Sequence, residues 1–450
     1  MTVLERRFSF TFRSLPLIFA VFFLFIQLQA ETQPEPAAVL TLEECISLAL
    51  QINPDFLASA YTVEESRIQA KEARSGFYPS VNLNAGGNIY SNRQDELRGQ
   101  TVSYSQYNAG ISAQYYLYQG GRKTAVYDAA KSAYRAAVSQ HKGSRNDLIL
   151  NVSQAYYRFL QAWHLERAAR QALERAEYFL GFAQARFDAG VVSRSDILQA
   201  EVERSNAELS LIRARNTRLF ASGVLNIFIG REAHLPLSVF DSLEELEFIE
   251  RRLEFDPLLA LALEQRPEIR NAEARIAAQK SNLRTAQSNL YPWISADTRA
   301  SLFGSSRSSG TGSGWSAGVS LNIPVFTGFA NQARIAQEKT ALDILDKQME
   351  ALKQGISQEV WNAYLDLKES EERIDNTAVL LDSARENLAI AEEEYREGIG
   401  SMIQVIDAET ALVAAEESRI EALADYKIAL AVVDRVTGAS NDAAAQGDLQ

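Results

Sequence analysis

The feature that most constrains the fold of this chain is an internal duplication. Asn53-Pro54-Asp55 and Tyr78-Pro79 recur 213 residues later as Arg266-Pro267-Glu268 and Tyr291-Pro292. Farther along the chain the offset becomes 208 and stays constant, so that Gly120, Gly190 and Gly230 recur as Gly328, Gly398 and Gly438. A constant offset means that the helices and strands of the two copies match in length. We therefore predict one structural unit present twice, at 31–230 and 255–438, with a linker at 231–254.

Each copy contains a long stretch with heptad spacing. Eleven of the twelve residues in 4,3 steps from Leu148 to Phe187 are apolar, Glu166 being the exception, and Ile356 to Tyr395 repeats the pattern. One heptad position is nearly always small, which lets two helix backbones approach closely. The pattern predicts an antiparallel coiled-coil hairpin in each copy, with helices at about 121–188 and 195–229, and at about 329–396 and 401–437. Arg175, one residue before the heptad position Ala176, is expected to be exposed.

A second pattern, with period two, predicts four β-strands at about 79–90, 104–118, 292–303 and 314–326. Each keeps the alternation for nine to eleven residues, the length that a tilted transmembrane strand needs. The alternative is two soluble hairpins, each packed on the helices through one face. Four strands cannot close a barrel, and lipid does not tolerate open edges, so spanning strands require a barrel shared by three or more chains. The strand boundaries are marked by Tyr78, Pro79, Gly120, Tyr291, Pro292 and Gly328.

The first thirty residues are typical of a signal peptide. Arg6, Arg7 and Arg13 accompany an apolar stretch, Leu15 to Leu28, which is shorter than the roughly 20 residues of a spanning helix. An N-terminal membrane anchor is the alternative. Residues 439–450 are predicted to be a flexible tail.

Composition argues against most catalytic and metal-binding classes. Cys45 is the only cysteine and the three histidines lie far apart, so the sequence offers no disulfide, no thiolate metal site and no HExxH motif. We expect no enzymatic activity, no cofactor and no metal. The net charge of −13 makes nucleic acid an unfavourable partner.

In these features the chain resembles the TolC-type outer-membrane efflux and secretion ducts, the outer membrane factors of Gram-negative bacteria. The resemblance rests on the Tyr-Pro pairs before the strands, Gly120 and Gly328 after them, and the turn segments around Gly190 and Gly398. It implies an α+β membrane protein: a homotrimer whose twelve-stranded β-barrel lies in outer-membrane lipid and continues into an α-helical tunnel across the periplasm. It also implies a passive exit duct of a tripartite efflux or type I secretion system, served by an inner-membrane pump and a periplasmic adaptor. A periplasmic coiled-coil scaffold or adaptor without a pore is the alternative.

The resemblance also indicates candidate functional residues. Adaptor docking is expected at the helical tips, formed by Ala189, Gly190, Val191, Glu397, Gly398 and Ile399. Such ducts commonly have Val before each turn glycine, where this chain has Ala189 and Glu397. A gate is expected just past the tips, where an Asp pair of the family is replaced by Gln404 and Asp407, joined here by Asp196 with links to Arg194 or Tyr395. The alternatives are ordinary helix C-caps at the glycines and solvated helix-start residues at the carboxylates.

Overall fold

The computed structural model describes residues 39–93, 101–243, 254–306 and 310–438. The predicted signal peptide and C-terminal tail lie outside these residues. The first copy consists of α2 (Leu42–Ile52), α3 (Pro54–Ser75), β1 (Ser80–Arg93), β2 (Thr101–Tyr118), α4 (Arg122–Asp188) and α5 (Arg194–Phe228). The second consists of α6 (Phe255–Gln265), α7 (Pro267–Ser288), β3 (Trp293–Ser305), β4 (Thr311–Asn322), α8 (Ala330–Glu397) and α9 (Met402–Thr437). Both copies therefore have the same order of elements.

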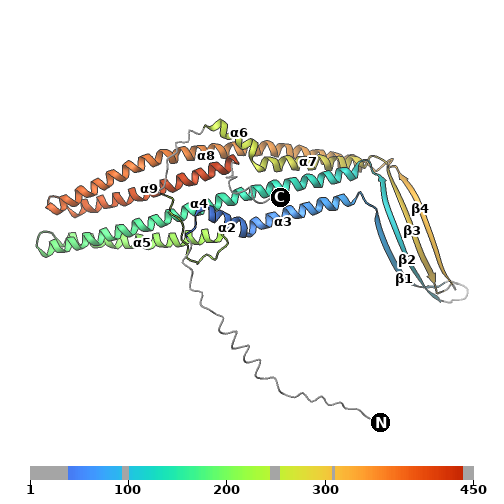
Figure 1. Cartoon of the computed structure of the whole chain (residues 1–450), viewed down its shortest axis with the longest axis horizontal. Coiled ribbons are helices and arrows are strands. Elements are labelled where there is room, and N and C mark those ends of the chain that lie inside the picture. The colour runs from blue at the N-terminus through green and yellow to red at the C-terminus, as the bar shows by residue number, and fades with distance from the viewer. Residues whose placement is uncertain (1–38, 94–100, 244–253, 307–309, 439–450) are drawn as a thin grey trace, which may run out of the picture.

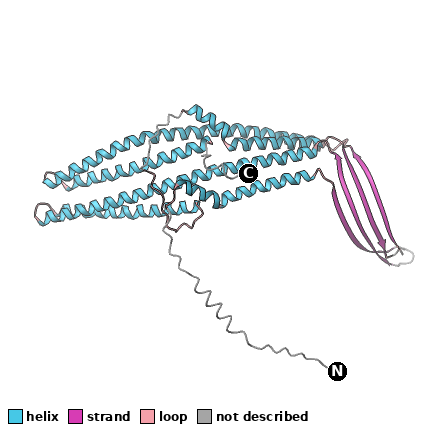
Figure 2. Ribbon diagram, in the orientation of Figure 1, coloured by secondary structure: helices cyan, strands magenta, loops and turns pink. Residues whose placement is uncertain are grey.

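The helices form an elongated body with the strands at one end and the hairpin tips at the other (Figures 1 and 2). Helices α4 and α8, of 67 and 68 residues, are each about 100 Å long and run the length of this body. Helix α4 packs against α3 and α7 on the strand side and against α5 toward the tips, while α8 packs against α7 and α9. Within the described helices, no segment is long and apolar enough to cross a bilayer.

Heptad positions form the helical core, most regularly in the second copy. Eleven of the twelve predicted positions from Ile356 to Tyr395 are buried. In the first copy the buried stripe moves to Ala168 and Ala172, one residue before the predicted Ala169 and Leu173. Along this stretch α4 contacts α9 as well as α5, so its buried face points between two neighbouring helices rather than at one.

Short helices precede the strands of each copy, in regions where the heptad pattern predicted none. The repeated proline segments mark the junctions α2–α3 and α6–α7, because proline suits the first turn of a helix. Asn53 caps α3 by accepting from the backbone N–H groups of Asp55 and Phe56 at 3.1 Å. Its counterpart Arg266 cannot cap in this way; it is 2% exposed and pairs with Glu268 and Glu359.

The strands form one antiparallel sheet in the order β1-β2-β3-β4, with β1 and β4 at its edges. The register places the alternating residues of all four strands on common faces. One row across the sheet is Leu83, Ile111, Ala300 and Trp315, and the next row is Asn82, Ser112, Arg299 and Ser316. The sheet therefore has one predominantly apolar face and one polar face.

Several strand boundaries differ from the predicted ones. Strand β4 ends at Asn322 and not at 326, because Pro324 has no N–H to donate and β3 provides no partner beyond Trp293. The hairpin ladders also run farther into the predicted loops, to Arg93 and from Thr101 in the first copy, and to Ser305 and from Thr311 in the second.

The linker is fixed to the middle of the helical body by polar contacts. The buried Tyr156 hydroxyl donates to the Phe240 carbonyl at 2.7 Å, and His164 lies 2.9 Å from an Asp241 carboxylate oxygen. Residues 39–40 join it through a parallel bridge between Leu40 and Val239. Linker residues 244–253 are outside the described part of the chain.

Candidate functional site

The two hairpin tips have the same backbone geometry. Gly190 and Gly398 have φ values of +75° and +83°, a conformation that glycine adopts without a Cβ clash. The N–H of Gly190 donates to Phe187 and that of Val191 to Arg186; in the second copy Gly398 and Ile399 donate to Tyr395 and Glu394. This pattern is the Schellman motif, which satisfies the last carbonyls of a helix within the chain. Each tip is thus a closed turn.

Apolar side chains at these turns face solvent in the single chain. Val191 is 62% exposed and Ile399 is 80% exposed. Ala189, the C-cap residue of α4, and Glu397, the last residue of α8, are exposed as well. A Cβ added to Gly190 would meet no atom within 4 Å. The predicted docking residues therefore form two accessible surfaces whose backbone is already satisfied internally.

Four of the predicted gate residues lie in the first two turns of α5 and α9, and one of them, Gln404, serves helix capping. Gln404 forms a capping box with Ser401, accepting from its N–H at 2.7 Å, so its amide is engaged locally. Asp196 accepts from the Ser193 hydroxyl at 2.8 Å. Arg194 and Asp407 are exposed.

Tyr395, the remaining gate candidate, joins the two hairpins. Tyr395 lies on α8 and is 2% exposed. Its hydroxyl is buried without a hydrogen-bond partner. Burial and the nearby carboxylate of Asp196, on α5, raise the pKa of Tyr395. Arg186 of α4 donates to the Tyr395 carbonyl and stacks over its ring at 4.9 Å. The structure thus brings Asp196 and Tyr395 together and adds Arg186, which the sequence identified only as part of the turn segment.

A charged cluster that the sequence analysis missed lies behind the tips. Arg175 is not exposed as expected: its side chain is 25% exposed and crosses from α4 to α9. Its Nε lies 2.7 Å from Glu409 and its Nη2 lies 3.3 Å from Glu416. Heptad spacing identifies the residues that face one partner helix, but α4 has a second neighbour here. The repeated pair Ala200-Glu201 and Ala408-Glu409 was the available signal, because it placed Glu409 beside a core alanine.

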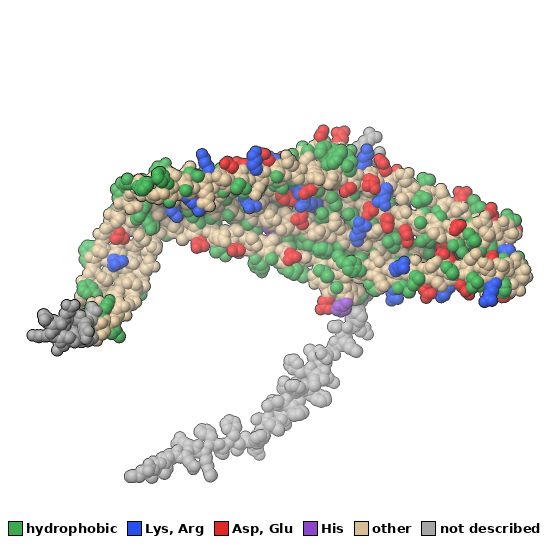
Figure 3. Space-filling model, turned by 180° about the vertical axis from the view of Figure 1, so that it is seen from behind, with side chains coloured by type: hydrophobic (Ala, Val, Ile, Leu, Met, Phe, Trp, Pro, Cys, Tyr) green, Lys and Arg blue, Asp and Glu red, His purple; other side chains and the backbone are tan. Residues whose placement is uncertain are grey.

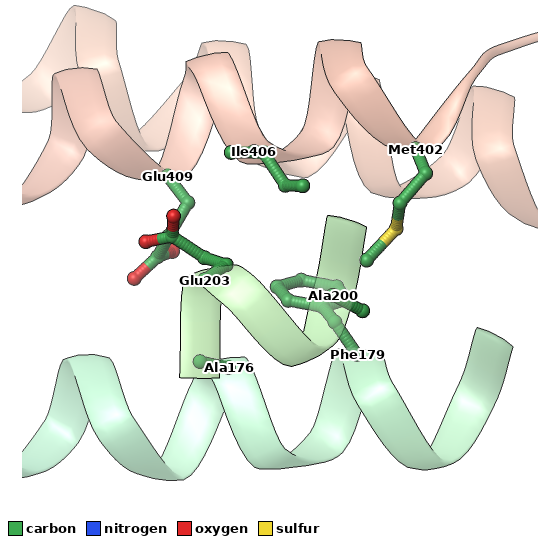
Figure 4. A pocket seen from close by; sticks show the side chains of 7 residues that line it. All are labelled: Ala176, Phe179, Ala200, Glu203, Met402, Ile406 and Glu409. Carbon is green, nitrogen blue, oxygen red and sulfur yellow. The ribbon is translucent and has the colours of Figure 1, made fainter. Parts of the chain in front are cut away.

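A small cavity of about 10 Å³ adjoins this cluster (Figure 4). Its walls are Ala176 and Phe179 of α4, Ala200 and Glu203 of α5, and Met402, Ile406 and Glu409 of α9. Within the described residues, no three His, Cys, Asp or Glu side chains are placed to hold one metal ion.

The strand boundaries are tight turns between sheet and helix. Gly120 and Gly328 have φ values of +58° and +62°. Gly120 lies against Tyr291 and the Ser288 carbonyl, whereas Gly328 has open space around it. Tyr78 and Tyr291 are more than half exposed. Pro79 and Pro292 each stand directly before a strand, at β1 and β3.

Comparison with known proteins shows the family to which this architecture belongs. The model of the family "Outer membrane efflux protein" matches residues 45–231 and 258–439, which are the two copies. The chain belongs to this family. Among its relatives are the toluene efflux pump outer membrane protein TtgF of Pseudomonas putida, 27% identical over 84% of this chain and 78% of that protein, and the cation efflux system protein CusC of Escherichia coli, 24% identical over 84% and 81%.

Solved structures of this family share the fold. The outer-membrane channel OprN superposes with a TM-score of 0.78 at 23% identity, covering 89% of this chain and 90% of that one. The chain is therefore an outer-membrane exit duct for efflux, in which the helical body lies in the periplasm. The family is one of ducts and not of enzymes. Membership in it favours the duct over the alternative of a periplasmic scaffold or adaptor without a pore.

Proposed function

We propose that three copies of the chain assemble into a duct with a shared twelve-stranded barrel and a continuous helical tunnel. The observation that carries this proposal is the sheet: it has an apolar face, a polar face and two edges, β1 and β4, that lack a partner strand within the described chain. Exposed edges are not stable in lipid, and copies of the same chain can pair them. Three sheets of four strands give a barrel with a polar lumen. Figure 3 supports placing the strands in lipid and the helices in water, since charged side chains cover the helical body and few lie on the strands.

A second heptad seam on α5 supports tunnel assembly. Five apolar residues on the exposed face of α5 fit 4,3 spacing, with the polar Ser205 and Asn216 at the two remaining positions. All five are at least half exposed: Leu198, Val202, Leu209, Ile212 and Leu219. A groove of about 570 Å³ lies between α4 and α5 beside this seam, and Phe220 and Phe228 are among its lining residues. Coiled-coil seams bury such rows against another helix. We assign that helix to a neighbouring copy.

The assembly is tested with the full chain purified from outer membranes. Unheated samples should migrate as a trimer in gels and boiled samples as a monomer. Cysteine pairs placed on the α5 seam and on α8 should form disulfide-linked dimers between chains, while the buried Cys45 should remain unreacted. A monomer that resists cross-linking at every pair would contradict the proposal.

We propose that Asp196 and Asp407 line a narrow periplasmic opening of this duct. In the trimer they would supply six carboxylates near the tips, and rings of this kind select cations. Asp196→Ala with Asp407→Ala should reduce the cation preference in planar-bilayer recordings. Glu393→Gln, at an exposed site paired with Arg396, is the matched control. Unchanged selectivity in the double variant would leave both residues as ordinary helix-start carboxylates.

We propose that the two tips dock a periplasmic adaptor, through which an inner-membrane pump delivers the cargo. The exposed Val191 and Ile399 beside Schellman turns are suited to pack against a partner. Gly190→Glu should abolish efflux, because it places a charge and a strained φ at the tip, while trimers still reach the outer membrane. Efflux at the native level from a well-expressed variant would refute docking at this tip. The two relatives are named for toluene and for cations, so the pump and not the duct is proposed to select the cargo.

A further inference from the structure

The cavity behind the tips is lined by a buried carboxylate, Glu409, of which only one oxygen has a hydrogen-bond partner. Glu409 is 2% exposed; its Oε1 accepts from Arg175, but its Oε2 is buried without any hydrogen-bond partner. An unsatisfied buried carboxylate oxygen is expensive, because it has lost its water and gained nothing in return. A protonated oxygen could instead donate to an acceptor across the cavity.

The other carboxyl group in this cavity is that of Glu203. It reaches the same cavity from α5, while Glu409 reaches it from α9 (Figure 4). The two carboxyl groups lie on the same side of the cavity in this view, and the Glu203 charge acts on Glu409. Asn206 hydrogen-bonds to Glu203 and holds it on its helix. The cavity therefore brings one carboxyl group from a hairpin of the first copy and one from a hairpin of the second into the same space.

The charges around the pair do not balance when every carboxyl is ionised. Helix α4 contributes Arg175 and α9 contributes Glu416, so one guanidinium faces three carboxylates. The buried residues of α8 in this core cluster are Ala384, Leu388, Ala391 and Tyr395; the first three do not titrate, and burial raises the pKa of Tyr395, so its phenol is neutral. One bound proton removes most of the imbalance, and two carboxyl groups sharing one proton are a recurring solution to it.

We propose that Glu203 and Glu409 share one proton across the α5–α9 contact, and that loss of this proton to water separates the two hairpins behind their tips. The bond broken is the carboxyl O–H, and two mutually repelling carboxylates remain. Burial raises the pKa of both groups above that of a free Glu. The packed arrangement of α5 and α9 therefore binds the proton more tightly than the separated one. The packed arrangement is favoured at low pH and becomes less stable as the pH rises through the raised pKa.

The test measures the distance between the two tips within one chain. Nitroxide labels at Val191→Cys and Ile399→Cys, in a Cys45→Ala background, occupy exposed sites on different hairpins. The full chain is diluted with unlabelled chain so that only pairs within one chain contribute. As the pH is raised the distance should increase, with a midpoint above the value of about 4.3 for free Glu. Glu203→Gln should keep the short distance throughout, because it removes the repelling charge.

The control is Glu201→Gln, an exposed carboxylate on the same helix, which should titrate like the native chain. A distance that does not change with pH in the native chain, or a titration that persists in Glu203→Gln, overturns the proposal. A shortened distance on adding Mg²⁺ at constant high pH would make this a cation site and would also overturn it. That this separation opens the duct rests on the function proposed above. The distance measurement does not rest on it, because the two labels lie within one chain whether or not a trimer forms.

Discussion

At the residue scale, the duplication supplies matched pairs that separate backbone strain from packing. Gly120 and Gly328 are equivalent and have nearly the same positive φ, but only Gly120 has atoms where a Cβ would lie: Tyr291 Cβ at 2.7 Å and Ser288 O at 2.9 Å. Gly328→Ala should cost about 1–2 kcal/mol for the left-handed backbone alone. Gly120→Ala should cost clearly more. Thermal unfolding followed by circular dichroism checks the order, with Gly355→Ala in mid-helix as a control that should not destabilise. Equal losses at the two sites would mean that the contact at Gly120 relaxes freely.

At the element scale, one interhelical contact uses different chemistry in the two copies. Glu166 pairs with Arg218 between α4 and α5, with side chains 10% and 25% exposed. The equivalent residues of α8 and α9 are Ile374 and Tyr426, 5% and 3% exposed. Arg218→Ala should destabilise the chain by about 1–3 kcal/mol, because the buried Glu166 carboxylate then keeps only its longer contact with the exposed Arg170, at 3.3 Å. The double change Glu166→Ile with Arg218→Tyr should be nearly neutral, because apolar residues of similar volume often replace a buried ion pair without loss. Urea unfolding of both variants tests this, and a double variant as unstable as Arg218→Ala would refute it.

At the scale of the whole molecule, the register of the sheet predicts which face meets lipid. Val319 pairs with Ala296 on the apolar face, and its neighbour Ser320 pairs with Ser295 on the other. Val319→Arg should impair assembly, since a charge on the lipid face near mid-depth costs about 2–4 kcal/mol. Ser320→Arg should assemble normally, because its side chain would point into an aqueous lumen. The yield of heat-modifiable trimers in outer membranes measures the difference. Trimers formed equally by both variants would show that the face assignment is wrong.

The sequence predicted the repeated unit, the long helices and the alternating faces because each depends on a period that one chain reveals alone. It did not predict the exposure of Arg175 correctly, nor the roles of Glu203 and Glu409. A heptad pattern describes the contact between two helices, whereas these residues lie where α4, α5 and α9 meet. Gln404 illustrates a second limit: the sequence predicts a gate residue at this position, whereas the structure shows that its amide is used by the Ser401 cap, a local contact that the gate prediction did not include.

The contrast between Glu166–Arg218 and Ile374–Tyr426 has a consequence for the symmetry of the duct. In the proposed trimer, three chains would bring six hairpins to the periplasmic end, and identical copies would give a sixfold arrangement. Here the buried pair Glu166–Arg218 of the first hairpin is replaced in the second by the apolar residues Ile374 and Tyr426, beside which the more exposed pair Arg373–Asp425 joins α8 to α9. The proposed opening thus has only threefold symmetry, and its six tips form two classes of three. Water weakens an ion pair more readily than an apolar contact, so water that reaches this level of the tunnel wall should loosen the Glu166–Arg218 contact in three of the hairpins, while the packing of Ile374 and Tyr426 is kept in the other three.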